Sequence, residues 1–392
     1  MRKIHLLILC LIIGASHMQG QSLKNIVDQA LTFSEKQYLL MAQKYGDEDG
    51  MLPRSFENGK DVKSDSRWWC SGFFPGSLWH IYENSKNPLI LKYAKLYTDR
   101  IEREKFTTDN HDVGFMIYCS FGNGYRLTKN NHYKEVMLTA AKSLSTRYNP
   151  RVGLIRSWDF NKDKWQYPVI IDNMMNLELL LWASDNSDNP KFKEVALSHA
   201  DKTIEHHFRP DNSSYHVVSY DTITGVPHIK QTHQGYSDES SWSRGQAWGL
   251  YGYTYLYRET KDERYLDQAK KIATYMINHP HMPKDYIPYW DFDAPDIPNT
   301  LRDVSAATIM ASALIDLSKF VDQKTSKEYK NVVEKQIRTL STPEYTAKLG
   351  ENGDFILKHN VGALLLDSEI DVPLTYADYY YLEALTKLKH EK

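Results

Sequence analysis

Cysteine is almost absent from this chain: three occur among 392 residues. Cys10 lies in the apolar N-terminal run, so the rest of the chain contains Cys70 and Cys119. Two thiols form at most one bridge, which excludes a disulfide scaffold, and neither has the spacing of a zinc ligand. Because both stand in apolar, aromatic surroundings, we predict that both are buried free thiols.

The sequence also lacks an excess of either charge. Its 48 Lys and Arg and 50 Asp and Glu give a formal charge of −2 and are interspersed along the chain. A nucleic-acid partner would require a basic stripe, which is missing. Metal-ligand spacings, a glycine-rich phosphate loop and a Gly-x-Ser-x-Gly elbow are missing too, so we expect no metal and no cofactor.

Long hydrophobic runs are restricted to the N-terminus, and the run there is too short to span a membrane. The basic pair Arg2-Lys3 precedes the mostly apolar residues 4–13, and small residues follow. This order is typical of a secretory signal peptide. We predict that residues 1–20 are this signal, that the protein is secreted through it, and that residues 21–392 form a single catalytic domain.

Helical periodicity dominates the rest of the chain, and strand-like alternation is scarce. Six segments are amphipathic and predict helices with one exposed face: residues 24–44, 88–104, 131–147, 190–207, 261–279 and 325–341. Six others are apolar nearly all round and begin with a polar cluster, which predicts buried helices. These are residues 72–82, 112–124, 172–184, 244–257, 303–317 and 375–388.

The alternation of the two classes predicts an all-α fold, an (α/α)6 barrel in which six outer helices surround six inner ones. An open solenoid of helical hairpins is the alternative, but the inner helices are too apolar for an exposed concave face. Each inner helix begins at the same end of such a barrel. The long, aromatic-rich connections before these helices should therefore gather around one mouth.

Residues 241–249, Ser-Trp-Ser-Arg-Gly-Gln-Ala-Trp-Gly, are the most informative stretch of the sequence. Tryptophan faces for a sugar ring, an arginine fork for a carboxylate and a glutamine amide for hydroxyls are the parts of a site for an acidic carbohydrate. The alternative interpretation is a helix start with ordinary packing.

Two aspartates stand at the polar starts of inner helices, Asp112 and Asp172. Either one alone would be interpreted as a helix cap. Two such ends converging on one mouth predict a pair of carboxyls for acid–base chemistry on a sugar, in which an apolar wall and a like charge raise one pKa. Asp303 stands next to Arg302 and is predicted to form a structural ion pair. His216 is a loop residue that could bind substrate.

Four separated motifs together resemble the unsaturated glucuronyl hydrolases, glycoside hydrolase family 88. They are His-Asp-Val-Gly-Phe (111–115), Ile-Asp-Asn-Met-Met-Asn (171–176), Trp-Ser-Arg-Gly-Gln-Ala-Trp (242–248) and Asp-Val-Pro-Leu-Thr-Tyr-Ala-Asp-Tyr (371–379). The similarity covers nearly the whole chain after the signal and implies an (α/α)6 barrel, which the helix pattern predicts independently. It also implies hydration of the C4=C5 double bond that polysaccharide lyases leave in the terminal uronate of an oligosaccharide.

The resemblance further implies a role for individual residues. Asp172 protonates C4 and activates the water that adds at C5, while Asp112 holds ring hydroxyls and stabilises the transition state. Substrate-contacting positions are matched by Trp69, Trp158, His216, Gln234, Trp242, Arg244, Trp248 and Ser368. Near Ser368, sulfate-tolerant members carry a Ser and Lys grouping, but no matching lysine is present here. The bacterial type of the resemblance leads us to expect a periplasmic location.

We predict that glycosaminoglycan oligosaccharides are the substrates. Three other functions stay open: an unsaturated rhamnogalacturonyl hydrolase acting on pectin fragments, a non-catalytic acidic-sugar-binding protein, and an inverting glycosidase acting on saturated substrates. A pure binder needs no proton donor, so Asp112 and Asp172 favour an enzyme. We expect no partner besides the oligosaccharide, and a monomer or weak homo-oligomer.

Overall fold

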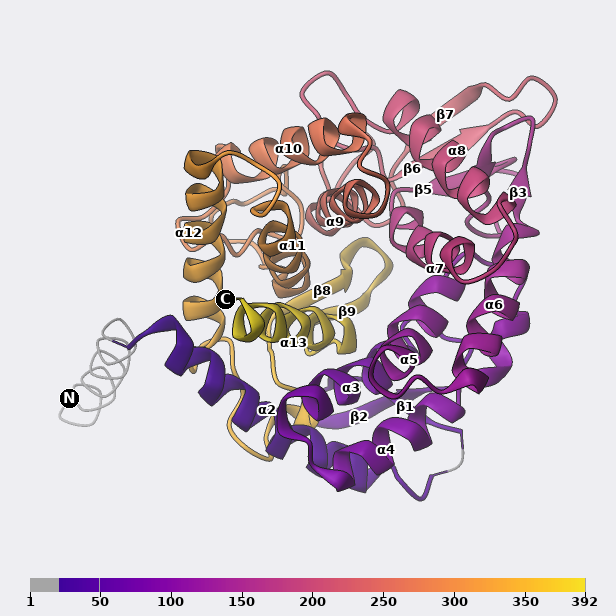
Figure 1. Ribbon diagram of the computed structural model, residues 1–392. Coiled ribbons are helices and arrows are strands. Elements are labelled where there is room, and N and C mark those ends of the chain that lie inside the picture. The colour runs from indigo at the N-terminus through magenta and orange to yellow at the C-terminus, as the bar shows by residue number, and fades with distance from the viewer. Residues whose placement is uncertain (1–20, 49, 392) are drawn as a thin grey trace.

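The computed structural model describes residues 21–48 and 50–391, so the predicted signal peptide (1–20) lies outside the described residues. Along the described part of the chain, outer and inner helices alternate as the periodicity predicted (Figure 1). The outer helices are α2 (Leu23–Lys44), α4 (Pro88–Asp99), α6 (Asn131–Ser145), α8 (Lys191–His206), α10 (Glu263–Asn278) and α12 (Gln323–Leu340). The inner helices are α3 (Phe73–Ser85), the π-helix η2 (Gly114–Gly122) continued by α5 (Asn123–Thr128), α7 (Asn173–Asp185), α9 (Ser243–Thr260), α11 (Val304–Leu317) and α13 (Thr375–His390).

The inner helices form a closed ring. Each contacts the next in chain order, from α3 through η2, α7, α9 and α11 to α13, and α13 returns to contact α3. Each later outer helix packs against the inner helix before it, while the first one, α2, packs against the last inner helix. The fold is therefore the predicted (α/α)6 barrel, and the open-solenoid alternative is wrong.

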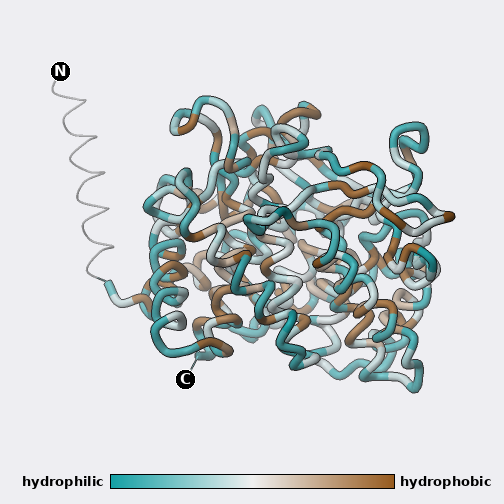
Figure 2. The backbone as a smooth tube through the Cα atoms, turned by 90° about the horizontal axis from the view of Figure 1, so that it is seen from above, coloured by the Kyte–Doolittle hydropathy of each residue, from teal (hydrophilic) through white to brown (hydrophobic). Residues whose placement is uncertain are grey.

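Local sequence signals explain where the outer helices begin and which helices are buried. Asn87, Asn130 and Asp262 each accept a backbone N–H at the start of α4, α6 and α10, respectively. By contrast, every residue of the inner helix α11 is buried, which is why its sequence is apolar all round. Figure 2 shows hydrophobic stretches within the helical body and many hydrophilic loops around its border.

The connections before the inner helices contain small antiparallel sheets that the sequence patterns did not predict. In the described residues β1 (Leu52–Glu57) pairs with β2 (Lys60–Ser64), β3 (Tyr148–Asn149) with β4 (Leu154–Ile155), β8 (Asn360–Ala363) with β9 (Ser368–Val372), and β6 (Val217–Tyr220) with both β5 (Pro168–Ile170) and β7 (Pro227–Gln231). Strands this short display no clear alternation of polar and apolar residues. Because β5 leads into α7 and β9 into α13, these sheets lie at the starts of inner helices and help to build the mouth.

The centre of the barrel is packed with aromatic side chains. Phe73, Phe115, Trp248 and Tyr380, from four different inner helices, contact one another with ring centroids 5.1–5.8 Å apart. None of the four is more than 2% exposed. This aromatic plug fills the barrel interior between its two ends.

Cys70 and Cys119 are buried and free, as predicted. Among the helices that the structure describes, none is both long and apolar enough to cross a membrane. Within the same residues, no group of three or more His, Cys, Asp or Glu side chains is arranged to hold a metal ion.

Candidate active site

Asp172 stands at the N-terminal end of α7, at the mouth of the barrel. Although it occupies the capping position, its side chain forms no capping hydrogen bond to the described backbone of α7. The residue is 7% exposed, and its Oδ2 has no hydrogen-bond partner among the described residues. Burial raises the pKa of Asp172 to about 7, even though the positive charge of Arg244 lowers it in part. A carboxyl with this pKa is both a proton donor and a proton acceptor near neutral pH.

Asp112 precedes the π-helix η2, on the inner helix next to α7. Its backbone N–H donates to Oδ1 of Asn110 at 2.9 Å, and its side chain is 20% exposed. The nearest imidazole nitrogen, Nε2 of His111, lies 3.3 Å from Oδ1. Burial raises the pKa of Asp112 to about 8, and the negative charge of Asp172 adds to this effect. The mouth therefore holds two coupled carboxyls that together retain a proton at neutral pH.

An imidazole faces Asp172 across the mouth. Nε2 of His216 lies 3.7 Å from Oδ2 of Asp172, longer than a direct hydrogen bond. Nδ1 accepts the backbone N–H groups of His233 and Gln234 at 3.0 and 3.1 Å, so the proton of the neutral ring is on Nε2. Burial keeps the ring neutral because it lowers the pKa of His216 well below its usual range. An N–H donor thus points toward the reactive carboxyl.

Two small contacts fix the spacing of the helices that carry the carboxyls. Asn176, one turn beyond Asp172 on α7, accepts the backbone N–H of Phe115 with its Oδ1 at 2.9 Å. Gly114 lies against the same side chain, and a Cβ at this position would come within 2.6 Å of the Asn176 Cα. Both residues belong to motifs quoted above, yet the sequence did not single them out. Their role depends on the contact between η2 and α7, which only the fold reveals.

The sequence predicted that Arg244 presents a free guanidinium to a ligand, but in the structure this group is bonded within the protein. The residue is 1% exposed; its Nη1 donates to Oδ2 of Asp303 at 2.8 Å and to the carbonyl of Val361, and its Nη2 donates to the carbonyl of Gly362. Its Nε has no hydrogen-bond partner in the described part of the chain. Asp303 does form a structural ion pair, but the expected partner, Arg302, is wrong because Arg302 pairs with a different aspartate. Contact between Arg244 and a substrate carboxylate stays a prediction.

Gln246, from the same motif, is also engaged within the protein. Its Oε1 accepts the backbone N–H of Ser214 at 2.9 Å, and its Nε2 donates to the carbonyl of Asn212 at 2.7 Å. The residue is fully buried. The expectation that this amide binds sugar hydroxyls is therefore wrong, because both of its polar ends hold the connection between α8 and α9.

Trp69 and Trp158 lie in the connections that surround the mouth. Trp69 is partly buried, and its ring centroid lies 4.9 Å from that of Tyr376. Trp158 is 7% exposed and stacks on Phe160, with centroids 4.8 Å apart and ring planes at 10°. Phe160 itself is 50% exposed, so it offers an aromatic face that sequence reasoning missed. The sequence signal that could have identified Phe160 is its position in one of the aromatic-rich connections before the inner helices.

Trp242 and Trp248 are more deeply buried, at 3% and 0% exposure. The Trp242 ring lies 4.6 Å from the His216 ring and 4.4 Å from the Arg244 guanidinium carbon, so it links the two. The Trp248 indole interacts with Asp172 and lowers the pKa of that carboxyl, although the indole N–H forms no hydrogen bond of standard geometry with any described residue. Trp248 thus forms the floor beneath Asp172, and its direct contact with a substrate stays a prediction.

Gln234 and Ser368 are both associated with the β8–β9 hairpin. Nε2 of Gln234 donates at 3.3 Å to the Gly362 carbonyl, which also accepts from Arg244. Ser368 is the first residue of β9, pairs with Ala363 and is partly buried. The hairpin is therefore anchored to α9 by the arginine and to the connection before α9 by the glutamine. The expected contacts of Gln234 and Ser368 with substrate stay predictions.

Comparison with known proteins identifies the family. Residues 48–390 match the profile of Glycosyl Hydrolase Family 88. An unsaturated glucuronyl hydrolase of Formosa agariphila is 46% identical over 339 residues, covering 86% of this chain and 84% of the relative. An unsaturated chondroitin disaccharide hydrolase of Streptococcus pneumoniae is 32% identical over 349 residues, covering 88% of this chain and 87% of the relative.

Solved structures agree with the sequence comparisons. A crystal structure of an unsaturated glucuronyl hydrolase specific for heparin superposes with a TM-score of 0.90 at 48% identity, covering 93% of this chain and 96% of that one. The unsaturated glucuronyl hydrolase from Bacillus sp. GL1 gives a TM-score of 0.87 at 29% identity, covering 93% of this chain and 97% of that one. The two-carboxyl mouth and these similarities agree: the chain is a glycoside hydrolase that belongs to glycoside hydrolase family 88.

Proposed function

We propose that this protein is an unsaturated glucuronyl hydrolase that removes the C4=C5 unsaturated uronate from lyase-generated glycosaminoglycan oligosaccharides. The names of its relatives support the activity, since they include unsaturated glucuronyl hydrolases and unsaturated chondroitin disaccharide hydrolases. The state of Asp172 is the observation that carries the proposal. Its carboxyl is buried, has one oxygen without a hydrogen-bond partner in residues 21–48 and 50–391, and has a pKa of about 7.

The chemistry needs a single carboxyl that first donates and then accepts a proton. The C4=C5 bond is part of a vinyl ether, so protonation at C4 by Asp172 leaves a cation shared by C5 and the ring oxygen. The resulting Asp172 carboxylate then removes a proton from the water that adds at C5, which returns the carboxyl to its starting state. The hemiketal opens by cleavage of the C5–O bond, and the hemiacetal left at C1 releases the remaining saccharide.

The other residues of the mouth assist this step. A carboxyl with a pKa near the working pH is suited to both halves of the cycle. Nε2 of neutral His216, which carries the ring proton, lies 3.7 Å from Oδ2 of Asp172 and presents a donor to that side of the carboxyl. Asp112, at the start of the neighbouring inner helix, binds ring hydroxyls, and the face of Phe160 on Trp158 offers a platform for a sugar ring.

Loss of ultraviolet absorbance tests the activity, because the double bond is conjugated to the uronate carboxylate and hydration removes that band. We expect the wild-type protein to remove the absorbance of unsaturated chondroitin, hyaluronan or heparin disaccharides and to leave saturated disaccharides unchanged. Asp172→Asn should lower kcat by roughly 10²–10⁴-fold while substrate still binds, since general acid–base catalysis contributes about that factor.

Asp267→Asn provides a matched control, because Asp267 is an exposed carboxylate on the outer helix α10, away from the mouth. This variant should retain wild-type turnover. Full activity of Asp172→Asn would contradict the assigned role, and release of sugar from saturated disaccharides would favour an inverting glycosidase. Tight binding of unsaturated disaccharides without turnover by the wild type would favour a non-catalytic binder.

An unsaturated rhamnogalacturonyl hydrolase is the competing activity on the same barrel. Competition between unsaturated chondroitin and unsaturated rhamnogalacturonan disaccharides separates the two, and we expect the chondroitin product to have the higher kcat/KM. We also propose a periplasmic location, supported by the signal-like order of residues 1–20. Cell fractionation with an antibody to the protein tests this location.

A further inference from the structure

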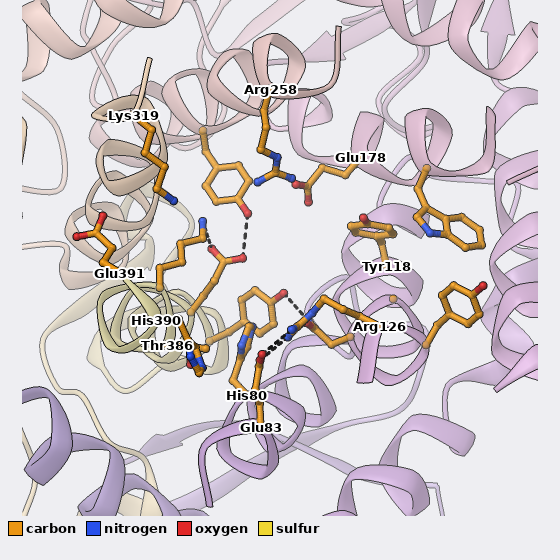
Figure 3. Close-up of a pocket in the computed structure, with 18 of the residues that line it drawn as sticks. His80, Glu83, Tyr118, Arg126, Glu178, Arg258, Lys319, Thr386, His390 and Glu391 are labelled. Carbon is orange, nitrogen blue, oxygen red and sulfur yellow. Dashed lines mark hydrogen bonds and ion pairs between the residues drawn. The ribbon is translucent and has the colours of Figure 1, made fainter. Parts of the chain in front are cut away.

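A cavity lies at the end of the barrel opposite to Asp112 and Asp172. Figure 3 shows the side chains that line it. Its volume is about 740 Å³, and its walls come from the C-terminal halves of inner helices, among them α3, α7, α9 and α13. This volume lies within the range of roughly 300–1,000 Å³ that is usual for small-molecule sites. Glu178 of this cavity follows Asp172 on the same helix by six residues, or about 9 Å along the axis.

The aromatic plug separates this far cavity from the mouth. Tyr380 of the plug contacts Trp248 on one side and Tyr251 on the other, with ring centroids 5.4 and 5.5 Å apart. Tyr251 lines the far cavity, whereas Trp248 lies beneath Asp172. The far cavity is therefore a separate site and not an extension of the mouth.

One side of the far cavity is a fixed network of ion pairs. Nζ of Lys387 lies 2.8 Å from Oδ2 of Asp316 and 3.2 Å from Oε2 of Glu383, and Arg258 pairs with the same Asp316 oxygen at 3.2 Å. The hydroxyl of Tyr251 donates to Oε1 of Glu383 at 3.0 Å. These groups satisfy one another, so this wall is already in place before anything binds.

Two buried polar groups in the cavity are not satisfied in this way. The carboxyl of Glu178, which is 8% exposed, has no hydrogen-bond or ion-pair partner among the described residues. His80 is 4% exposed, and neither of its ring nitrogens has a hydrogen-bond partner in the part of the chain that the structure describes. Burial raises the pKa of Glu178 to about 8 and lowers that of His80 to about 4, so both are neutral at pH 7. They offer two donors and two acceptors to a polar ligand.

The remaining lining supplies aromatic faces and positive charge. Trp182, Tyr118 and Tyr125 are only partly buried, and an aromatic face is what a sugar ring stacks on. Six Lys and Arg side chains line the cavity against four Glu, of which Glu178 is neutral. Five of the six cations pair with Glu83, Asp316 or Glu391, whereas Lys129 forms no ion pair within the described residues. Exposed Lys129 is among the cations at the rim.

We propose that the far cavity is a second binding site, which takes a small acidic sugar. The ring stacks on the Trp182 side, its hydroxyls pair with Glu178 and His80, and its carboxylate faces the rim lysines. The lining therefore selects a ligand that is rich in hydroxyls, stacks on an aromatic face and carries a negative charge. The inference does not rest on the proposed activity, because none of these residues belongs to the mouth.

Fluorine NMR of protein labelled with 5-fluorotryptophan tests the proposal with D-glucuronate as the probe. Replacing each tryptophan singly with Phe assigns the signals, so binding at the far cavity (Trp182) is distinguished from binding at the mouth (Trp158, Trp242). We expect the Trp182 signal to shift saturably with D-glucuronate. Neutral D-glucose should bind there about tenfold more weakly, because it lacks the charge-assisted contacts.

Variants then test the individual contacts. Glu178→Leu should weaken the Trp182 response about tenfold, whereas Glu178→Gln keeps a neutral donor and should restore it. The double variant Lys129→Ala/Lys330→Ala should lose the preference for glucuronate over glucose, and Lys193→Ala, on the exposed face of α8, should behave as wild type. An unchanged spectrum of the other tryptophans shows that each variant is folded. The proposal is overturned if D-glucuronate leaves the Trp182 signal unmoved, or if Glu178→Leu binds as the wild type does.

Discussion

Substituting Arg244 tests the role that the structure gives this residue inside the protein, as the partner of a buried carboxylate. Asp303, which it contacts at 2.8 Å, is completely buried, so Arg244→Met leaves a carboxylate without its partner. Breaking a buried ion pair in this way costs about 3–5 kcal/mol. Since a large domain loses roughly 2 °C of melting temperature per kcal/mol, we expect a fall of about 6–10 °C by differential scanning calorimetry.

The double variant Arg244→Met/Asp303→Asn provides the critical comparison. Asparagine removes the charge but still accepts the backbone N–H of Ser305, which Asp303 caps at 3.1 Å. The double variant should therefore recover more than half of the lost stability, with the remainder reflecting the lost donors to Val361 and Gly362. If it melts as low as Arg244→Met alone, the unpaired charge is not the cause and the reasoning is refuted.

Three further predictions concern the pH profile, the helix spacing and the thiols. Because Asp172 donates a proton and its pKa in the free protein is about 7, kcat/KM should be high below this pH and fall about tenfold for each unit of pH well above it. A flat profile of kcat/KM from pH 6 to 9 would contradict its role as the acid. Gly114→Ala and Asn176→Ala should both lower kcat more than they raise KM, since each shifts η2 against α7. Measuring kcat and KM separately on an unsaturated disaccharide tests this. An unchanged kcat would show that the contact does not position the two carboxyls. Burial raises the pKa of both Cys70 and Cys119, so iodoacetamide at pH 8 should label neither until urea is added, as mass spectrometry would detect.

The helical architecture was predictable because it follows from the spacing of apolar residues along each segment of the chain. Helices such as α11 are apolar all round because they are buried on every side, and those such as α10 begin where Asp262 caps them. The short sheets around the mouth were not predictable. Strands such as β5 obtain their partners from segments some fifty residues away, and no local pattern records that pairing.

The candidate site, too, was predictable from the sequence only in part. The sequence by itself determined that Asp112 and Asp172 begin inner helices, and therefore that their carboxyls meet at one mouth, because all inner helices of a closed barrel start at the same end. It could not determine the state of Arg244 or Gln246, since a polar side chain in a motif is equally compatible with binding a ligand and with binding the protein. Only the tertiary structure decided this: folding brings Asp303 and the carbonyls of the β8–β9 hairpin against the guanidinium, and burial of Asp172 raises its pKa into the range where it serves as an acid.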